Sequence, residues 1–194
     1  MNVSRKQLGE MIPSTERLLD KFYEPLQETL ERYAINNTRR IAAFIAQITH
    51  ETESLHYMEE IDSGMVYTGR RDLGNDLPEA IVIAKAHGKE TGPFFKGRGG
   101  IQTTGYLNYK KVAEALNIDC VNTPQLLTDP RYAMLSSGIF WVTHGRRVEG
   151  ESLNCNELAD LDFFTLICRV VNGGTRGLQR RLNYYRNNIR ILHE

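Results

Sequence analysis

The sequence has no excess of charge of either sign and no long apolar run. Lysine and arginine together number 24, and aspartate and glutamate also number 24. Because a chain with balanced charge has no long-range field, its composition does not point to nucleic acid or to an anionic membrane. No stretch reaches the roughly 18 apolar residues of a membrane-spanning helix. We therefore expect neither nucleic acid binding nor stable membrane insertion.

Signals for export, disulfides and metal are also missing. The first twenty residues carry charged side chains throughout and lack the apolar core of a signal peptide. His50-Glu51 begins like the zinc motif H-E-x-x-H, but position 54 is serine. We therefore expect no metal, no cofactor and synthesis in the cytoplasm. Three cysteines without a C-x-x-C pair predict buried, reduced thiols: Cys120, Cys155 and Cys168.

Helical signals dominate what is present. Ser4 with Gln7 predicts a capping box, and Pro25 predicts a kink or a break in the helix that follows. Residues 61–76 are rich in turn formers and predict a loop or a short hairpin. The expected helix starts lie at or just after Ser4, Ser14, Thr38, Pro78, Leu107, Pro130, Asp162 and Leu178. The fold class expected is mainly α, as one domain over 1–194 with a small irregular or β lobe at roughly 61–100.

Two glutamates have the placement that acid–base chemistry needs. Glu51 ends a helix and follows Phe44 and Ile48 on its apolar face. A carboxylate there requires either a partner or a proton, and the protonated form is the one a general acid uses. Glu60 follows nine residues later, with Glu59 directly beside it. Such a pair suits hydrolysis of a glycosidic bond.

Residues 97–105 read GRGGIQTTG and are too rich in glycine for a regular helix. Glycines allow the backbone to approach a sugar chain closely, and Gln102, Thr103 and Thr104 add polar groups. The segment matches neither phosphate-binding fingerprint, because position 102 is glutamine and no Lys-Ser/Thr follows.

Taken with RRIAAFIAQITHETESLHYMEE at 39–60 and VVNGGTRGLQRRLNYY at 170–185, this segment resembles the family 19 chitinases and their bacteriophage endolysin relatives. The N-terminal stretch with Leu8, Met11 and Pro13 looks like the phage branch. The resemblance covers nearly the whole chain. It implies a lysozyme-like α+β fold with a substrate cleft between lobes, inversion at the anomeric carbon and no cofactor.

The same resemblance implies roles for individual residues. Glu51 matches the general acid, and Glu60 matches the base that activates water. Thr104 matches the residue that helps to hold this water. Arg181 and Asn172 match residues that contact sugar or tune the second carboxylate. Gln102 and Asn108 match cleft residues, and Tyr67 and Tyr106, both expected in loops, are candidates for stacking on sugar rings.

Structural interpretations stay open for several of these residues. Glu51 could be ion-paired with Arg98 or Arg39, and Glu60 could be a surface glutamate. Thr104 could be the N-cap of the helix expected at 107. Asn172 also fits a helix terminator, and Arg181 fits a solvated charge. Trp141 is expected in the core. Glu59 competes with Glu60 for the role of base, and only the nine-residue interval favours Glu60.

The function predicted is hydrolysis of the β-1,4 bond of bacterial peptidoglycan by a monomeric endolysin of the phage type. In that case the enzyme would act in the periplasm after permeabilisation of the membrane, without a separate wall-binding module. One alternative is a chitinase that acts on polymers of N-acetylglucosamine. Another is a non-catalytic protein that binds cell walls.

Overall fold

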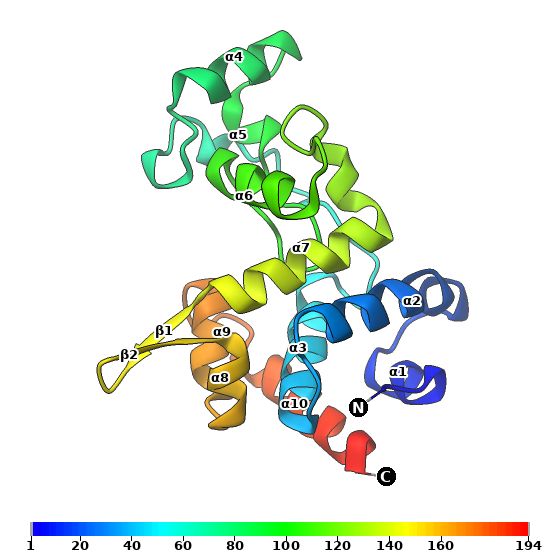
Figure 1. Ribbon diagram of the computed structural model, residues 1–194. Coiled ribbons are helices and arrows are strands. Elements are labelled where there is room, and N and C mark those ends of the chain that lie inside the picture. Colours follow the sequence, from blue (N-terminus) through cyan, green and yellow to red (C-terminus); the bar gives the residue numbers. More distant parts are fainter. Residues whose placement is uncertain (1, 194) are drawn as a thin grey trace. The chain divides into compact units, whose positions relative to one another are not determined.

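The computed structural model describes residues 2–193 and is mainly helical, as the sequence predicts (Figure 1). Within that range the one sheet has two strands. The α-helices are α1 (Arg5–Met11), α2 (Glu16–Arg32), α3 (Thr38–Glu51), α4 (Pro78–Ala86), α5 (Thr91–Phe94), α6 (Tyr106–Leu116), α7 (Pro130–Thr143), α8 (Cys155–Asp160), α9 (Phe164–Asn172) and α10 (Leu178–His193). The 3-10 helices are η1 (Met65–Tyr67), η2 (Arg71–Leu73) and η3 (Pro124–Thr128), and the strands are β1 (Gly145–Val148) and β2 (Glu151–Asn154).

The chain divides into two compact units. The first comprises the chain up to His56 and again from Gly138, and the second is Tyr57–Ser137. The small lobe expected at 61–100 lies within the second unit, which continues to Ser137. Helix α7 contributes residues to both units.

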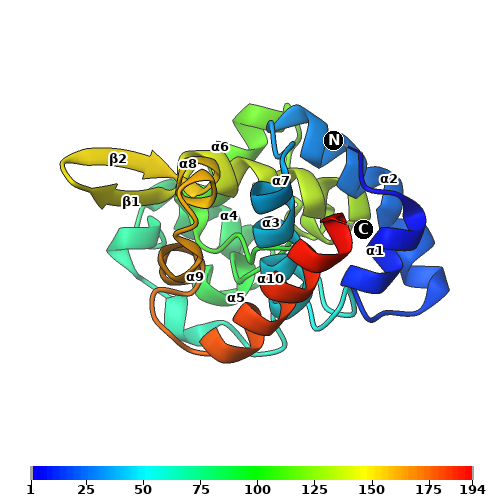
Figure 2. The same ribbon diagram turned by 90° about the horizontal axis from the view of Figure 1, so that it is seen from below.

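Helix α3 is the central helix of the first unit. All residues from Ile41 to Thr49 are buried, so apolar contact surrounds the helix and is not confined to the one stripe expected from the sequence. Helix α10 packs along α3, and α8 and α9 also contact it (Figures 1 and 2). The last turn of α3, which ends at Glu51, is therefore surrounded by other helices of this unit.

The helix ends agree with the sequence in part. The capping box of Ser4 and Gln7 is present, and α9 ends at Asn172 with Gly173 in the left-handed conformation. Asn37, and not Thr38, caps α3. Helix α2 continues through Pro25 without a break. This is tolerated because the carbonyl of Lys21, which loses its helical partner, lies on the exposed side.

The β hairpin lies in the first unit and outside the segment 61–76, where the sequence had left a hairpin open. That segment forms η1 and η2 instead. In the hairpin, Glu149 and Gly150 have φ values of 50° and 95°, which is the pattern of a tight two-residue turn. Gly145 pairs with Asn154, and a Cβ at Gly145 would lie 1.8 Å from the carbonyl oxygen of Leu153. Only glycine therefore fits at the start of β1.

The second unit has an aromatic core around Phe95. Its ring contacts those of Phe94, Tyr106 and Tyr109 at centroid distances of 4.8, 5.5 and 5.5 Å. These contacts join α5 to α6. The Gly97–Thr104 segment, which carries the glycine-rich motif, connects the two helices.

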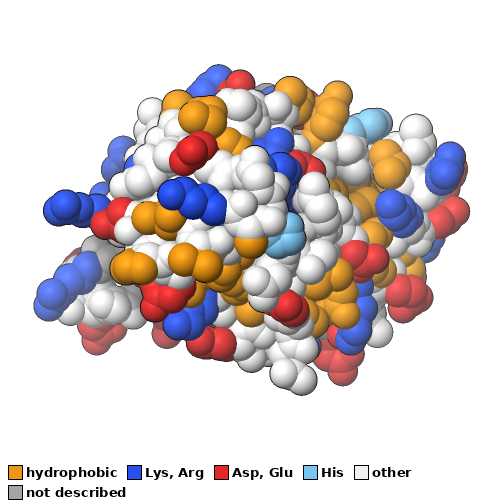
Figure 3. All heavy atoms as spheres, turned by 90° about the horizontal axis from the view of Figure 1, so that it is seen from above, with side chains coloured by type: hydrophobic (Ala, Val, Ile, Leu, Met, Phe, Trp, Pro, Cys, Tyr) orange, Lys and Arg blue, Asp and Glu red, His pale blue; other side chains and the backbone are white. Residues whose placement is uncertain are grey.

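The thiols and the surface agree with the composition. All cysteines are free and buried, which confirms the expectation of reduced thiols. Burial raises the pKa of Cys120 and of Cys155 to about 12, so both thiols stay protonated. Figure 3 shows basic and acidic side chains interspersed over the face in view. Among residues 2–193, no helix is long and apolar enough to cross a membrane.

Candidate functional site

The residues predicted for the site fall into two groups, one in each unit. Glu51, Asn172 and Arg181 belong to the first unit. The others belong to the second unit: Glu60, Tyr67, Gln102, Thr104, Tyr106 and Asn108. Each group has its own supporting contacts.

Glu51 is ion-paired in the first unit. Its side chain is 19% exposed, and its Oε1 accepts a hydrogen bond from Nη2 of Arg181 on α10. Arg181 is only 2% exposed, so it is not the solvated charge that the sequence left open. The partner is neither Arg98 nor Arg39. The contact with Arg181 offsets the cost of burying this carboxyl group in part.

Gln47 is a member of this cluster that the sequence analysis missed. It lies one helical turn before Glu51 and is fully buried. Its Oε1 accepts a hydrogen bond from Nη1 of Arg181, and its Nε2 lies 3.2 Å from Sγ of Cys168. One arginine therefore holds two side chains of α3 four residues apart. A glutamine among apolar residues at this spacing was the available signal.

His50 lies beneath the loop that joins α9 to α10. A Cβ at Gly177 would lie 2.5 Å from Cε1 of His50, so the loop backbone covers the imidazole closely. Asn172 helps to shape this loop, because its Nδ2 donates to the carbonyl of Arg176 at 3.1 Å. Burial, reinforced by the charges of Arg181 and Arg180, lowers the pKa of His50 to about 4. The imidazole is therefore neutral at pH 7.

Glu53, two residues after Glu51, is also ion-paired. Both of its oxygens accept hydrogen bonds from Arg180, at 3.0 and 2.9 Å. The hydrogen bond and charge of Arg180 hold the pKa of Glu53 below its ordinary value. This pair is exposed on both sides, so it contributes little to stability.

In the second unit, the glycine-rich segment pairs with the chain around Glu60. The amide of Glu60 donates to the carbonyl of Gly97 at 2.9 Å, and the amide of Gly99 donates to that of Met58 at 2.9 Å. Arg98 and Thr103 exchange two backbone hydrogen bonds across the same segment, at 3.1 and 2.7 Å. These bonds form a short ladder that places Glu60 beside Gly97.

Two donors hold the side chain of Glu60. Tyr67 Oη donates to Oε1 at 2.9 Å, and the amide of Gly97 donates to Oε2 at 3.2 Å. Within residues 2–193, Glu60 has no ion pair. Burial and the hydrogen bond to Glu60 raise the pKa of Tyr67 to about 12, so its hydroxyl remains a donor at neutral pH. Two neutral donors therefore orient a carboxylate that no cation neutralises.

The carboxylate of Glu59, unlike that of Glu60, contacts two cations. Its Oε1 lies 3.0 Å from Nη2 of Arg98 and 3.1 Å from Nζ of Lys96. Burial alone would raise the pKa of Glu59, but Arg98 and Lys96 outweigh it and lower this pKa. A carboxylate held by two cations is a weak base. The geometry therefore favours Glu60 over Glu59, which the sequence could separate only by an interval.

Thr104 lies beside Gly97, the residue whose amide donates to the carboxylate of Glu60. Thr104 Oγ1 donates to the carbonyl of Gln102 at 2.9 Å, and a Cβ at Gly97 would lie 3.2 Å from the same hydroxyl. The Oε1 atom of Gln102 is buried without a hydrogen-bond partner. Asn108 Nδ2 donates to the carbonyl of Thr104 at 2.8 Å. Thr104 is not an N-cap, because α6 begins after Gly105 without a side-chain cap.

The aromatic predictions divide. Tyr67 lies at the end of η1, half-buried, with its hydroxyl on Glu60. Tyr106 is not in a loop: it opens α6, is 6% exposed and packs on Phe95. This burial leaves its ring little surface for a sugar. Trp141 is in the core as expected, fully buried with its ring edge-to-face on Phe44.

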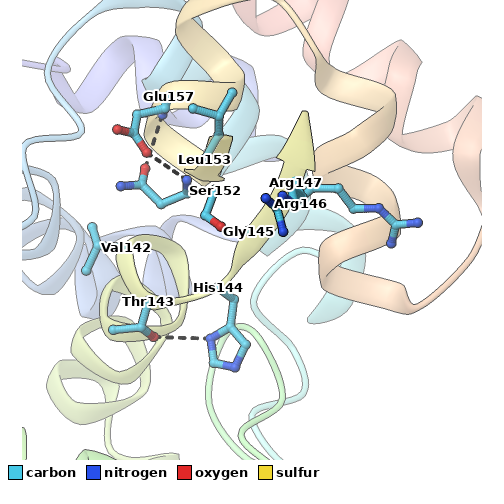
Figure 4. Close-up of a pocket in the computed structure, with 10 residues that line it drawn as sticks. Val142, Thr143, His144, Gly145, Arg146, Arg147, Ser152, Leu153 and Glu157 are labelled. Carbon is cyan, nitrogen blue, oxygen red and sulfur yellow. Dashed lines mark hydrogen bonds between the residues drawn. The ribbon is translucent and has the colours of Figure 1, made fainter. Parts of the chain in front are cut away.

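A pocket of about 390 Å³ lies at the base of the hairpin and contains none of the predicted site residues (Figure 4). Several of its polar side chains already make local hydrogen bonds. His144 Nδ1 lies 3.1 Å from the hydroxyl of Thr143, Glu157 accepts from the amide of Asn154, and Arg147 Nε donates to the carbonyl of Gly150. We therefore place the candidate chemistry at the glutamates.

Comparison with known proteins connects these features to one group. The family model of glycoside hydrolase family 19, described as chitinase class I, matches residues 30–152, well over half of the chain. An acidic endochitinase of Petunia hybrida is 28% identical over 178 residues, covering 80% of this chain and 62% of the relative. An acidic endochitinase of Dioscorea japonica is 30% identical over 155 residues, covering 76% and 54%. The chain therefore spans about half to three fifths of these relatives.

Solved structures share the fold. A bacterial family 19 chitinase superposes with a TM-score of 0.73 at 21% identity, covering 99% of this chain and 95% of the other. Chitinase C from Streptomyces griseus gives a TM-score of 0.74 at 21% identity, covering 98% and 76%. At this identity the likeness establishes the architecture, which is the lysozyme-like helical fold expected from the sequence.

Proposed function

This chain belongs to glycoside hydrolase family 19, and from that premise we propose that it hydrolyses the β-1,4 bond between amino sugars in a structural polysaccharide. The observation that carries the proposal is the contrast among the four glutamates between positions 51 and 60. Glu51, Glu53 and Glu59 each have an arginine partner, whereas the carboxylate of Glu60 accepts hydrogen bonds only from Tyr67 and the Gly97 amide. Glu60 is therefore the carboxylate suited to accept a proton from water.

Glu51 acts as the general acid in this proposal. Its Oε1 accepts from Arg181, which leaves Oε2 to carry the proton that goes to the glycosidic oxygen. As this proton leaves, Glu51 becomes a carboxylate, and the buried guanidinium of Arg181 stabilises the charge that forms. The bond between the anomeric carbon and the glycosidic oxygen breaks in the same step.

Glu60 acts as the general base in this proposal. It removes one proton from a water molecule while the water oxygen attacks the anomeric carbon on the face opposite the departing sugar. One bond forms and one breaks, the configuration inverts, and the two carboxyl groups return to their starting states by exchange with solvent. Thr104, whose hydroxyl lies near Gly97, is proposed to help position this water.

The first candidate substrate is chitin. The similar curated proteins carry the name endochitinase, and they match this chain over 76–80% of its length. Their names favour a polymer of N-acetylglucosamine over the peptidoglycan predicted from the sequence. The intact set of polar residues around both glutamates supports catalysis and not wall binding alone.

Peptidoglycan remains the second candidate, for a specific reason. The N-terminal stretch that resembles the phage branch forms helix α1, with Leu8 and Met11 buried, and α1 packs against α10, which carries Arg181. As an endolysin, the protein would cleave the bond between the two amino sugars of the wall. It would act in the periplasm once the membrane is permeabilised.

Product analysis separates these substrates and tests the reaction itself. Chitin hexasaccharide and purified Gram-negative peptidoglycan are digested in parallel, products are identified by mass spectrometry, and proton NMR follows the anomer formed first from the β-linked chain. We expect the α-anomer as the initial product, and an initial β-anomer would contradict inversion. The folded Glu51→Gln variant should release no product, whereas Glu53→Gln should remain active. Absence of product from both substrates with the unchanged chain would contradict the proposal.

A further inference from the structure

Tyr67 is placed to orient the side chain of Glu60 before any substrate arrives. Its hydroxyl binds Oε1 at 2.9 Å while the Gly97 amide binds Oε2 at 3.2 Å. Each oxygen of the carboxylate therefore has one fixed donor. Rotation of the carboxyl group about its last bond would break both hydrogen bonds together. Each oxygen keeps a second lone pair, which is the acceptor that a water molecule could use.

Tyr67 is itself held by a buried residue that no motif indicated. Asn75 is completely buried, and its Nδ2 donates to the backbone carbonyl of Tyr67 at 2.8 Å. Its Oδ1 accepts from the backbone amide of Tyr106 at 2.9 Å, at the first turn of α6. A single amide side chain thus connects the backbone of Tyr67 to the helix that follows the Gly97–Thr104 segment.

The packing around Asn75 leaves this connection little freedom. A Cβ at Gly105 would lie 2.5 Å from Cβ of Leu73, and a Cβ at Gly74 would lie 2.5 Å from Cγ of Leu107. The residues before Asn75 therefore pack directly against the start of α6. Because close-packed segments transmit small displacements, Tyr67 and the Gly97–Thr104 segment share one rigid support.

We propose that Tyr67 is a positioning residue for Glu60 and that Asn75 acts through Tyr67. The inference rests on the proposed role of Glu60 as the base and adds the two residues that set its orientation. Tyr67 thereby has a different role from the sugar stacking expected from the sequence. Its hydroxyl donates to the carboxylate, and the buried Asn75 holds its backbone.

The test is Tyr67→Phe, with Tyr132→Phe as the matched control. Tyr132 lies half-buried on α7, and it loses the same hydroxyl without touching Glu60. Loss of a hydrogen bond to a charged group should lower kcat of Y67F about tenfold while KM changes by less than about twofold. The acidic limb of the kcat/KM profile should move to higher pH, because the lost donor favours the ionised carboxylate. Y132F should match the unchanged protein in all three quantities.

Asn75→Ser tests the second part of the proposal. N75S should lower kcat several-fold on its own but add less than about twofold to the loss already present in Y67F, because both changes act on the same carboxylate. If the fold-loss in kcat of the double variant equals the product of the losses in the two single variants, Asn75 does not act through Tyr67. Measurements well below the unfolding temperature of each variant separate this effect from loss of folded protein.

A measurement without substrate distinguishes this inference from the proposed function. Carbon-13 NMR of the labelled Glu60 carboxyl group follows its protonation in the unchanged protein, Y67F and Y132F. Protonation that begins at higher pH in Y67F alone supports the positioning role even if no polysaccharide is cleaved. An unchanged titration in Y67F, together with an unchanged kcat, would overturn it in an active enzyme. An unchanged titration alone would overturn it in a protein that cleaves neither substrate.

Discussion

At the scale of single residues, the partners of a carboxylate decide its role more than its place in the sequence does. Glu59 and Glu60 are neighbours in the sequence, yet their carboxylates have different partners. Glu59 is ion-paired with Lys96 and Arg98, the second of which is buried. The carboxylate of Glu60 meets only neutral donors, and Lys96 reaches this residue only at its backbone carbonyl. Pairs of carboxyl groups whose surroundings differ in this way indicate which one is structural and which one reacts.

The two glutamates should therefore respond differently to the same substitution. Glu60→Gln removes the proposed base and should lower kcat by about 10²–10⁴-fold with little change in stability. Glu59→Gln leaves the buried guanidinium of Arg98 without its carboxylate and should lower the free energy of unfolding by roughly 1–3 kcal/mol. It should retain activity at temperatures where it is folded. Steady-state kinetics and thermal unfolding of both variants provide the check, and an inactive but folded E59Q would reverse the assignment.

At the scale of elements, local signals predicted local structure and little else. The capping box at Ser4 and the stop at Gly173 depend on residues within one turn, so the sequence contained the full pattern. The hairpin at 145–154 was missed because its strands are short and its side chains mostly exposed, which leaves no apolar alternation. The pairing of Glu51 with Arg181 spans 130 positions and exists only because α10 packs on α3. No periodicity encodes such a contact.

The loop between α9 and α10 allows a sharp test of this argument, because its glycines differ in their surroundings. Gly177 has φ +70° and a Cβ position 2.5 Å from His50, Gly173 has φ +69° with open space, and Gly174 has open space without a positive φ. Alanine at Gly174 should leave the free energy of unfolding within about 1 kcal/mol or raise it slightly. Alanine at Gly173 should lower it by about 1–2 kcal/mol through backbone strain alone.

Alanine at Gly177 should lower the free energy of unfolding more than alanine at Gly173 does, because the new methyl group also displaces the imidazole of His50. Thermal unfolding of the three variants gives the order of stabilities. If alanine lowered the free energy of unfolding equally at Gly173 and Gly177, the imidazole would move without cost. The close packing of Gly177 on His50 would then not contribute to stability.

At the scale of the whole molecule, the half-buried imidazole of His50 should dominate the response of stability to mild acid. The pKa of His50 is about 4 in the folded protein, against 6.5 in the absence of structure. Between these values the unfolded chain binds a proton that the folded protein does not, so stability is complete above pH 6.5 and is lost as pH falls towards 4. The carboxyl groups of Glu53, Glu59 and Asp160 have lowered pKa values, and their contributions are lost only below their ordinary values of 4.5 or less.

Among the groups with lowered pKa values, His50 therefore accounts for the change in stability between pH 6.5 and 4.5. Because its side chain is only partly buried, we expect a loss on the order of 2 kcal/mol across the full range. The one tryptophan, Trp141, is buried in the first unit with His50, so its fluorescence reports the unfolding of that unit.

Denaturant unfolding is followed by this fluorescence at several pH values. It gives the slope of the free energy of unfolding against pH. His50→Asn should flatten the slope between pH 4.5 and 6.5, whatever its effect on stability at pH 7. His193→Asn, at an exposed position on α10, should keep the slope of the unchanged protein. If H50N retains the full slope, the proton taken up on unfolding is bound elsewhere. The tight cover of Gly177 over the imidazole would then not be what keeps His50 neutral.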